Sequence, residues 1–200
     1  MWENRYRSAG EYLFGITPAG FLIENPGWLR PGLRALSVAD GEGRNSTYLA
    51  EMGLEVAAFD MAPTAVERGR ALAVAKGVLV NFNVAGWDDW DWSDDRFDLI
   101  VAIFIQYAPP TIRDRQFADL RRALAPGGVL MLHGYTPDQV GLGTGGPGDP
   151  AHMYTVDMLR DAFGDWQIER LAAYEREVQE GSGHSGRSAL IDLIVRKPAG

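Results

Sequence analysis

A short glycine-rich segment, Ser37-Val-Ala-Asp-Gly-Glu-Gly-Arg-Asn45, is the first part of the sequence whose residue types suit ligand chemistry. Gly41 and Gly43 let the backbone turn sharply and approach a ligand closely, and the helix expected behind them presents free N–H groups. Asp60 ends the next apolar run, where a carboxylate accepts both hydroxyls of a ribose. Taken singly, the glycines are also typical of an ordinary turn, and Asp60 of a helix cap. Together they predict a nucleoside-binding site.

Two further polar segments extend this prediction. Asn83-Val84-Ala85 follows another apolar run, and its amide and backbone are placed to contact an adenine edge, although a plain turn fits the same residues. Glu180, His184 and Arg187 lie in a polar segment between the last two expected strands. We expect this segment to return over the ligand side of the sheet, within reach of a substrate. A polar surface hairpin is the alternative interpretation.

Strand and helix patterns alternate along the chain and would position these residues. Apolar runs predict strands over 34–39, 55–59, 78–84, 97–105, 129–132, 166–174 and 188–196. Helices are expected over 44–52, 63–76, 114–124 and 155–163. This alternation predicts an α/β fold with a doubly wound, mostly parallel seven-stranded sheet. The last strand is expected to be antiparallel, because no helix separates it from its predecessor. We expect one domain over 1–200, with 1–33 as an N-terminal lid segment.

Composition excludes several classes of protein and site. The 27 acidic residues outnumber the 19 basic ones, and a net charge of -8 argues against a nucleic-acid or anionic-membrane partner. Without cysteine there is no disulfide, thiolate metal site or cysteine nucleophile, and the three histidines lack helical ligand spacing, so no metal site is predicted. His133 follows an apolar run and is interpreted as a satisfied strand-end histidine. The polar start and the lack of a long apolar run favour a cytoplasmic protein with no specified oligomeric state.

With these segments in view, the sequence resembles a class I S-adenosylmethionine-dependent methyltransferase, an enzyme of EC class 2.1.1. Within that class it is similar to the small bacterial group related to the tellurite-resistance (TehB-like) methyltransferases. The resemblance covers nearly the whole chain and has the Rossmann-like fold as its implied architecture. The matching segments are 2–6, 11–15, 41–49, 56–60, 102–105, 126–128, 181–184 and the closing strand 188–197.

The resemblance implies a cofactor, S-adenosyl-L-methionine, and a set of residues that bind it. The turn lies against the methionine part, Asp60 holds the ribose and Met61 packs on the adenine. Ile103 and Phe104 flank the sulfonium and the substrate. The implied cofactor-binding residues are Ala39, Asp40, Gly41, Gly43, Asn45, Asp60, Met61, Asn83, Val84, Ile103 and Phe104.

Two positions of the glycine-rich segment depart from the pattern of these enzymes. Ser37 stands where they carry an acid at the end of the first strand, and Ala39 stands where they carry the first glycine. The acid's contribution to ordering the turn and the methionine amine is thereby weakened. Asp40 and Glu42 are the two candidates to compensate.

Methyl transfer is an in-line displacement on a cationic sulfonium, so an enzyme mainly binds and aligns the two partners. A base is needed only when the nucleophile carries a proton that must leave. His184 and Arg187 correspond to the loop that meets an oxyanion in the tellurite enzymes. We hypothesise that Arg187 attracts a small anionic acceptor, a chalcogen oxyanion or a thiol, while His184 and Glu180 orient or deprotonate it. An aromatic lid that excludes water is expected from Tyr12, Phe14 and Tyr107.

Two other functions fit part of the pattern. Gly41-x-Gly43 with Asp60 also suits an NAD-dependent dehydrogenase, but we expect no room for a substrate domain, and the antiparallel last strand favours the methyltransferase. A non-catalytic module that holds S-adenosylmethionine without transferring its methyl group is supported by Ser37 and Ala39. Binding of NAD against S-adenosylhomocysteine, and consumption of labelled cofactor, distinguish the three.

Overall fold

A computed structural model describes residues 1–10, 12–94, 96–181 and 184–200, apart from the side chain of His184. The chain forms two compact units. The first holds Met1–Asp91 and the segment that begins at Glu180, and the second holds Trp92–Gln179 and His184–Gly200. The glycine-rich segment therefore falls in the first unit, and the predicted residues Ile103 and Phe104 fall in the second.

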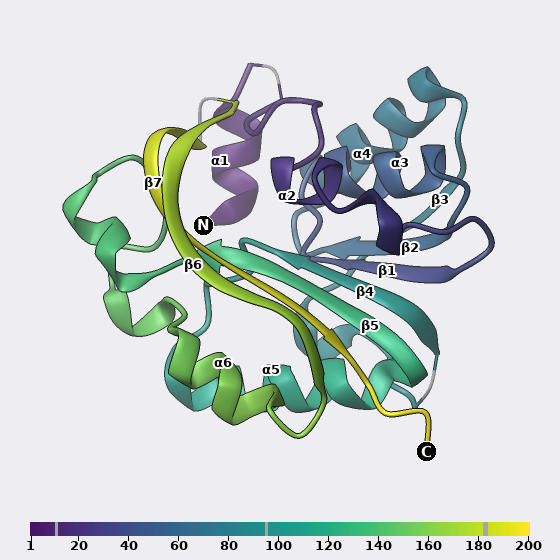
Figure 1. Cartoon of the computed structure of the whole chain (residues 1–200). Helices are drawn as coiled ribbons and strands as arrows, with labels where there is room; N and C mark the ends of the chain where they lie inside the picture. Colours follow the sequence, from purple (N-terminus) through teal and green to yellow (C-terminus); the bar gives the residue numbers. More distant parts are fainter. Residues whose placement is uncertain (11, 95, 182–183) are drawn as a thin grey trace. The chain divides into compact units, whose positions relative to one another are not determined.

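The strands of the first unit are all parallel and bring their carboxyl ends to one edge (Figure 1). Val38 is the partner of Phe59 across the first pair, and Asp60 is the partner of Val84 across the second. Ligands of open α/β sheets bind outside such an edge, so the register places Asp60 where the sequence predicts a ligand. The strands are β1 (Arg34–Val38), β2 (Glu55–Asp60) and β3 (Val80–Val84).

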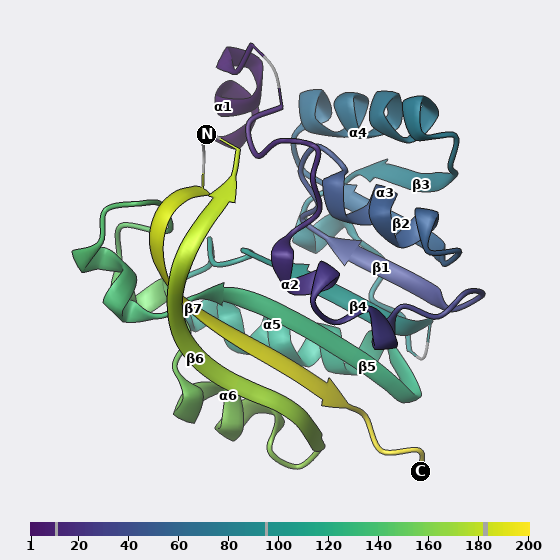
Figure 2. The same ribbon diagram turned by 45° about the horizontal axis from the view of Figure 1, so that its top comes forward.

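The helices of the first unit follow the expected start and stop signals. Pro63 opens a helix that ends where Gly77 adopts a left-handed conformation (φ 69°), as predicted. The preceding helix, Arg44–Glu51, packs against the helix that Pro63 opens and against β2, as Figure 2 shows. The two helices nearest the N-terminus are not among the helices expected from the sequence. The helices are α1 (Trp2–Ser8), α2 (Gly20–Ile23), α3 (Arg44–Glu51) and α4 (Pro63–Lys76), with short 3-10 turns at Pro26–Trp28 and Trp87–Asp89.

The second unit contains the most deeply buried strand and the antiparallel pair. Six of the seven residues of the first strand, β4, are buried, which explains its nearly continuous apolar sequence. β4 pairs with β5 in parallel, and β5 pairs with β7 antiparallel, as the sequence predicts. The hydroxyl of Thr155 accepts from the Met158 N–H (3.2 Å) and caps α6. The elements are β4 (Phe97–Ile103), α5 (Pro110–Ala123), β5 (Leu124–Tyr135), α6 (Val156–Phe163), β6 (Gln167–Glu180) and β7 (His184–Arg196), with 3-10 turns at Pro137–Gly141 and Pro150–His152.

The strand order β3-β2-β1-β4-β5-β7-β6 confirms the predicted fold class, a mostly parallel seven-stranded sheet with one antiparallel strand. The expectation of a loop from Glu180 to Arg187 is wrong, because Glu180 ends β6 and Arg187 lies inside β7. The physical reason is that β6 is an edge strand, where polar side chains are tolerated and mask the strand pattern. Ser182 and Gly183 lie outside the described residues.

Candidate functional site

The connection from β1 to α3, Ser37–Ser46, turns through three left-handed residues, and we call it the glycine turn. They are Ala39 (φ 47°), Gly41 (φ 64°) and Gly43 (φ 85°). A Cβ added at Gly43 would lie 2.7 Å from the Cα of Gly69, so α3 and α4 approach each other as closely as their backbones allow. Ala39 keeps the left-handed conformation at a cost of about 1 kcal/mol, because its Cβ crowds the following carbonyl.

Asp40 points into the glycine turn. Its carboxylate accepts hydrogen bonds from the Ser37 hydroxyl (2.6 Å), the Ser46 N–H (3.2 Å) and the Ser46 hydroxyl. Asp40 thereby satisfies an N–H in the first turn of α3 and holds the serine that replaces the usual acid. Burial raises the pKa of Asp40 to about 7, against the opposing effect of the serine hydrogen bonds. Of the two candidates to compensate for Ser37, Asp40 is the one that contacts it.

Glu42 instead holds the N-terminal segment. Its carboxylate accepts from the Leu13 N–H (2.7 Å) and from the Arg68 guanidinium (2.6 Å). Arg68 also donates to the carbonyl of Ala9 (2.8 Å) and its own carbonyl accepts from the Tyr12 hydroxyl (3.3 Å). The predicted lid residue Tyr12 is thus tied to α4, and Glu42 is committed to this contact.

Asp60 closes the glycine turn from the end of β2. One carboxylate oxygen accepts from the Gly41 N–H (2.9 Å), and the other accepts from the Ala62 N–H (2.9 Å) just before α4. Burial raises the pKa of Asp60, although both backbone hydrogen bonds favour the charged form. Each carboxylate oxygen has a second lone pair, so the side chain retains capacity to accept from a diol. The expected helix-cap role and a ligand role are therefore compatible.

Exposed apolar side chains flank Asp60. Met61 is 62% exposed and Val84, the partner of Asp60 on β3, is 49% exposed. The Asn83 amide donates to the carbonyl of Asn81 (3.1 Å) and is half-buried. A carboxylate held by a turn, with apolar side chains beside it at the same strand edge, fits a ribose joined to a flat ring system.

Tyr6 of α1 is the contact that sequence reasoning missed at this turn. A Cβ at Gly41 would lie 2.8 Å from the Tyr6 hydroxyl, so only glycine admits the tyrosine there. The ring packs edge-on to Phe14 (6.4 Å between centroids) and near Trp2 (6.1 Å). Burial and the negative charges of nearby carboxylates raise the pKa of Tyr6 above its ordinary value. Residues 2–6 carried the family resemblance, and that match was the available signal.

A profile described as "Methyltransferase domain" matches residues 35–128, from the start of β1 into β5. The matched segment is just under half of the chain, and the chain as a whole has the fold of solved S-adenosylmethionine-dependent methyltransferases. S-adenosylmethionine is the cofactor of this domain, and the chemistry of Asp60, Met61 and Val84 fits it. The fold implied by the resemblance is confirmed, and the profile match supports the methyltransferase class.

Relatives of the methyltransferase domain include uncharacterized mycobacterial proteins. One, from Mycobacterium tuberculosis (strain ATCC 25618 / H37Rv), is 31% identical over 124 residues, which are 60% of this chain and 44% of that protein. A second, the 2-heptyl-1-hydroxyquinolin-4(1H)-one methyltransferase of Mycobacteroides abscessus, is 32% identical over 99 residues, which are 48% of this chain and 44% of that protein. The chain thus spans about half the length of the curated relatives it matches.

Solved structures share the fold of the methyltransferase domain over almost the whole chain. A structure reported for the conversion of a disulfide bond into a thioacetal group during echinomycin biosynthesis has a TM-score of 0.79 at 22% identity, covering 99% of this chain and 92% of that one. TehB from Haemophilus influenzae has a TM-score of 0.70 at 14% identity, covering 98% of this chain and 65% of that one. At these identities the similarity concerns the fold.

Of the predicted catalytic residues, Glu180 belongs to the first unit. Its carboxylate pairs with Arg44 (2.7 Å) and accepts from the Gly20 N–H (3.0 Å), with both charged side chains nearly buried. The predicted cofactor residue Asn45 likewise accepts from the Ala19 N–H (2.9 Å). Glu180 and Asn45 thus both hold the N-terminal segment that was predicted as a lid.

Arg187 and His184 have different surroundings. Arg187 donates to Glu175 (2.7 Å) and its side chain is 66% exposed. His184 opens β7, and its side chain lies outside the described residues. Among the side chains that the structure describes, Glu180 and Arg187 therefore have separate ionic partners, Arg44 and Glu175.

The predicted residues of the second unit lie where β4 ends. Ile103 is the last residue of β4, and Phe104 follows it with a left-handed backbone (φ 54°), which is strained for a bulky residue. The predicted lid residue Tyr107 accepts a hydrogen bond from Gln116 (3.0 Å). Within the described ranges, none of the helices has the length and apolar character needed to cross a bilayer.

Proposed function

We propose that the chain transfers the methyl group of S-adenosylmethionine to a small-molecule acceptor, within a single domain over residues 1–200. The observation that carries this proposal is the carboxylate of Asp60, fixed by the Gly41 N–H at the parallel-strand edge of a methyltransferase domain. Residues 1–33 act as the lid, because their backbone N–H groups are held by the side chains of Glu42 and Asn45 in the glycine turn and of Glu180.

When bound, S-adenosylmethionine supplies an electrophilic methyl group on a cationic sulfonium. The chain's own residues bind and align it. Asp60 holds the ribose, Met61 and Val84 cover the adenine, and the backbone of the glycine turn meets the methionine part. Phe104 and Ile103 flank the acceptor. Alignment of the two reactants supplies most of the rate enhancement. The main contribution of the first unit to catalysis is therefore the glycine turn, which its hydrogen bonds keep rigid.

For the acceptor we propose a chalcogen oxyanion or a thiol, with Arg187, His184 and Glu180 around it. The fold similarity to TehB supports the oxyanion, and the named substrate of the Mycobacteroides abscessus relative, a hydroxyquinolinone, supports a small molecule that carries a hydroxyl or thiol proton. The two classes make different demands, because only an acceptor with a proton to lose needs a base.

The experiment is release of S-adenosylhomocysteine from S-adenosylmethionine with tellurite, selenite, benzyl mercaptan and para-cresol as acceptors. Acceptor-dependent release supports the proposal, and its absence with every acceptor contradicts it. Arg187→Ala is expected to weaken tellurite binding while leaving the affinity for S-adenosylhomocysteine unchanged. Equal tellurite affinity in the variant would remove Arg187 from the acceptor site.

The same protein distinguishes the two other functions. A dehydrogenase would bind NAD and not S-adenosylhomocysteine in a calorimetric titration. A non-catalytic module would bind S-adenosylhomocysteine and leave labelled S-adenosylmethionine unconsumed with all four acceptors. The methyltransferase proposal expects binding of S-adenosylhomocysteine, no binding of NAD, and consumption.

A further inference from the structure

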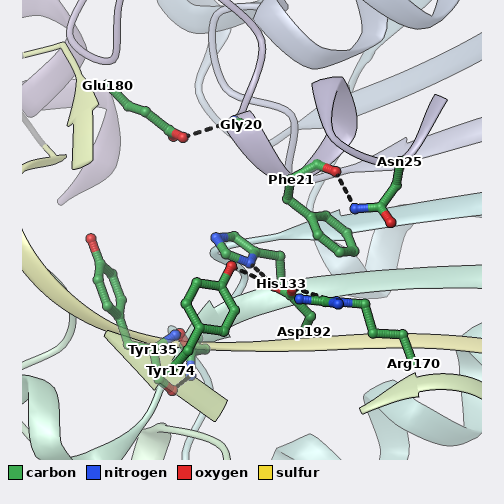
Figure 3. A network of polar contacts seen from close by, with 10 residues as sticks. Gly20, Phe21, Asn25, His133, Tyr135, Arg170, Tyr174, Glu180 and Asp192 are labelled. Carbon is green, nitrogen blue, oxygen red and sulfur yellow. Dashed lines mark hydrogen bonds and ion pairs between the residues drawn. The ribbon is translucent and has the colours of Figure 1, made fainter. Parts of the chain in front are cut away.

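Four polar side chains of the second unit form one cluster, which we call the strand network. It consists of His133 on β5, Asp192 on β7, and Arg170 and Tyr174 on β6 (Figure 3). His133 and Asp192 are direct partners across the antiparallel β5–β7 pair, so their side chains leave the sheet on the same face. Arg170 and Tyr174 share a face of β6 because they are four positions apart, and side chains alternate between the two faces of a strand.

Asp192 is the centre of the strand network. One carboxylate oxygen contacts Nδ1 of His133 (2.7 Å) and accepts from the Tyr174 hydroxyl (3.0 Å), and the other accepts from Nε of Arg170 (2.8 Å). Burial raises the pKa of Asp192, but the hydrogen bonds of His133 and Arg170 and the charge of Arg170 outweigh burial and lower its pKa overall. Asp192 is therefore an ionised carboxylate, which only accepts hydrogen bonds.

The ionised carboxylate fixes the tautomer of His133. Since Asp192 can only accept, Nδ1 of the histidine must carry the hydrogen of the 2.7 Å contact. In the neutral ring the other nitrogen, Nε2, then carries the lone pair, and Figure 3 shows it on the side of the ring away from Asp192. A carboxylate on Nδ1 is the arrangement that orients a histidine for taking up a proton at Nε2.

His133 also lies where a substrate is expected. It is the register partner of Ile103 at the carboxyl end of β4, the edge at which α/β sheets bind ligands. The ring of Phe104 meets the histidine edge-on at 4.9 Å, and the Phe104 N–H donates to the His133 carbonyl (2.8 Å). Phe104 is the residue that was predicted to flank the acceptor. Its strained left-handed backbone holds its ring against His133.

A second histidine–aspartate pair in the same unit shows what an ordinary pair looks like. His152 lies 4.0 Å from Asp149, three residues away in a 3-10 turn, and Asp149 is mostly exposed. His133 and Asp192 are instead nearly inaccessible to solvent, 2.7 Å apart and distant in sequence. Burying an ionised carboxylate is costly, and a histidine that only fills space has no need of one.

We propose that His133 is the general base of this methyltransferase, oriented by Asp192 as a positioning residue, and that the acceptor is a neutral thiol or hydroxyl compound. The proposal rests on the proposed methyltransferase function and, of the acceptors proposed there, selects the class that carries a proton over the oxyanion. The acceptor's S–H or O–H bond breaks and its proton goes to Nε2 of His133. The electron pair left on the acceptor forms the bond to the methyl carbon, while the carbon–sulfur pair of the sulfonium stays on sulfur and yields S-adenosylhomocysteine. Because His133 is nearly inaccessible to solvent, its proton leaves only after the methylated product has departed and water has taken its place.

The test compares acceptors that differ in their proton at a fixed pH of about 7. Benzyl mercaptan and para-cresol keep their proton there, whereas para-nitrothiophenol is already ionised. His133→Gln is expected to lower kcat roughly 100-fold or more on the two neutral acceptors and to leave para-nitrothiophenol within about threefold of wild type. Asp192→Asn is expected to lower kcat at least about tenfold on the neutral acceptors only, through loss of the tautomer. His152→Gln is the matched control and is expected to match wild type on all three.

Each other result decides against the proposal in its own way. An equal loss on neutral and ionised acceptors assigns His133 a structural role, and no loss removes it from the reaction. If the wild-type protein methylates para-nitrothiophenol but neither neutral acceptor, the neutral acceptor class is wrong. It is also wrong if the wild-type protein binds S-adenosylhomocysteine but methylates none of the three acceptors. Failure to bind S-adenosylhomocysteine, measured separately by calorimetry, contradicts the proposed methyltransferase function itself. Binding of S-adenosylhomocysteine by His133→Gln with wild-type affinity shows that the variant is folded.

Discussion

Two buried aspartates of this protein, Asp40 in the glycine turn and Asp192 in the strand network, experience opposite electrostatic environments. Within the part of the chain that the structure describes, Asp40 accepts from neutral serine groups, and burial raises its pKa to about 7. Asp192 is also buried, yet the hydrogen bonds of His133 and Arg170 and the charge of Arg170 outweigh that burial and lower its pKa. Burial by itself does not set the charge of an acid; the charge of its hydrogen-bond donors does. Asp40 is therefore suited to order the backbone of the glycine turn, whereas Asp192 is suited to hold a fixed negative charge in the strand network.

The largest expected effect comes from removing the charge of the strand network. Asp192→Ala leaves the His133 N–H, the Tyr174 hydroxyl and the Arg170 guanidinium without their acceptor, and we expect a loss of about 3 kcal/mol in the free energy of unfolding. Urea denaturation measures it. A loss below about 1 kcal/mol would mean that the network does not depend on its carboxylate.

The glycine turn should be limited by steric contact rather than by charge. Gly43→Ala places a Cβ 2.7 Å from the Cα of Gly69, and together with its left-handed backbone we expect a loss of about 2 kcal/mol. Gly77→Ala is the matched control, because it has a similar left-handed φ (69°) with nothing within 4 Å of the added Cβ. Its expected loss is about 1 kcal/mol, and equal losses in the two variants would refute the close approach of α3 and α4.

The two aspartates should also give stability a pH dependence of opposite sign. The pKa of Asp40 is raised above its unfolded value of 3.8, so its protonated form stabilises the fold below about pH 4, and this contribution falls by roughly 1.4 kcal/mol per pH unit up to about pH 7. The pKa of Asp192 is lowered, so its contribution is present above the unfolded value and is lost as the pH falls through the folded one.

Denaturation of wild type and Asp40→Asn from about pH 4 to pH 7 measures the first slope. The stability of the variant relative to wild type should rise steadily across that window. Asp192→Asn should instead differ most from wild type at neutral pH and approach it in acid. A pH-independent difference for either variant contradicts the stated charge of that aspartate.

The smallest effect is a gain of stability. Ala39 is held at φ 47°, and Ala39→Gly removes the crowding of the Cβ at the cost of a more flexible unfolded chain. The net expectation is a gain of about 0.5 kcal/mol, seen as a higher denaturation midpoint with an unchanged slope. A loss of stability in Ala39→Gly would indicate that packing of the Ala39 methyl group stabilises the fold by more than its left-handed backbone costs.

The sequence predicted the parts of this protein that depend on local pattern. Proline and glycine fixed both ends of α4, apolar runs located the seven strands along the chain, and the glycine pair with Asp60 located the predicted cofactor edge. It failed where tertiary pairing decides the outcome. The alternation of polar residues on the edge strand β6 hid the strand continuing to Glu180, and so Arg187 was expected in a loop.

The strand network was missed for a related reason. His133 and Asp192 are 59 positions apart, and only the antiparallel register of β5 and β7 makes them partners. From the sequence, His133 is one histidine at the end of an apolar strand. Its charged partner becomes visible only when the strand order is known, because long-range pairing leaves no periodic signal within a single segment.

The central claim is that S-adenosylmethionine binds at the edge of the first unit through Asp60, and calorimetric titration of S-adenosylhomocysteine tests it most directly. Asp60→Asn removes one charged acceptor and should weaken binding at least about tenfold. Glu55→Gln removes the same charge from the exposed opposite end of β2 and should bind like wild type. Equal affinity in wild type and both variants would contradict the claim.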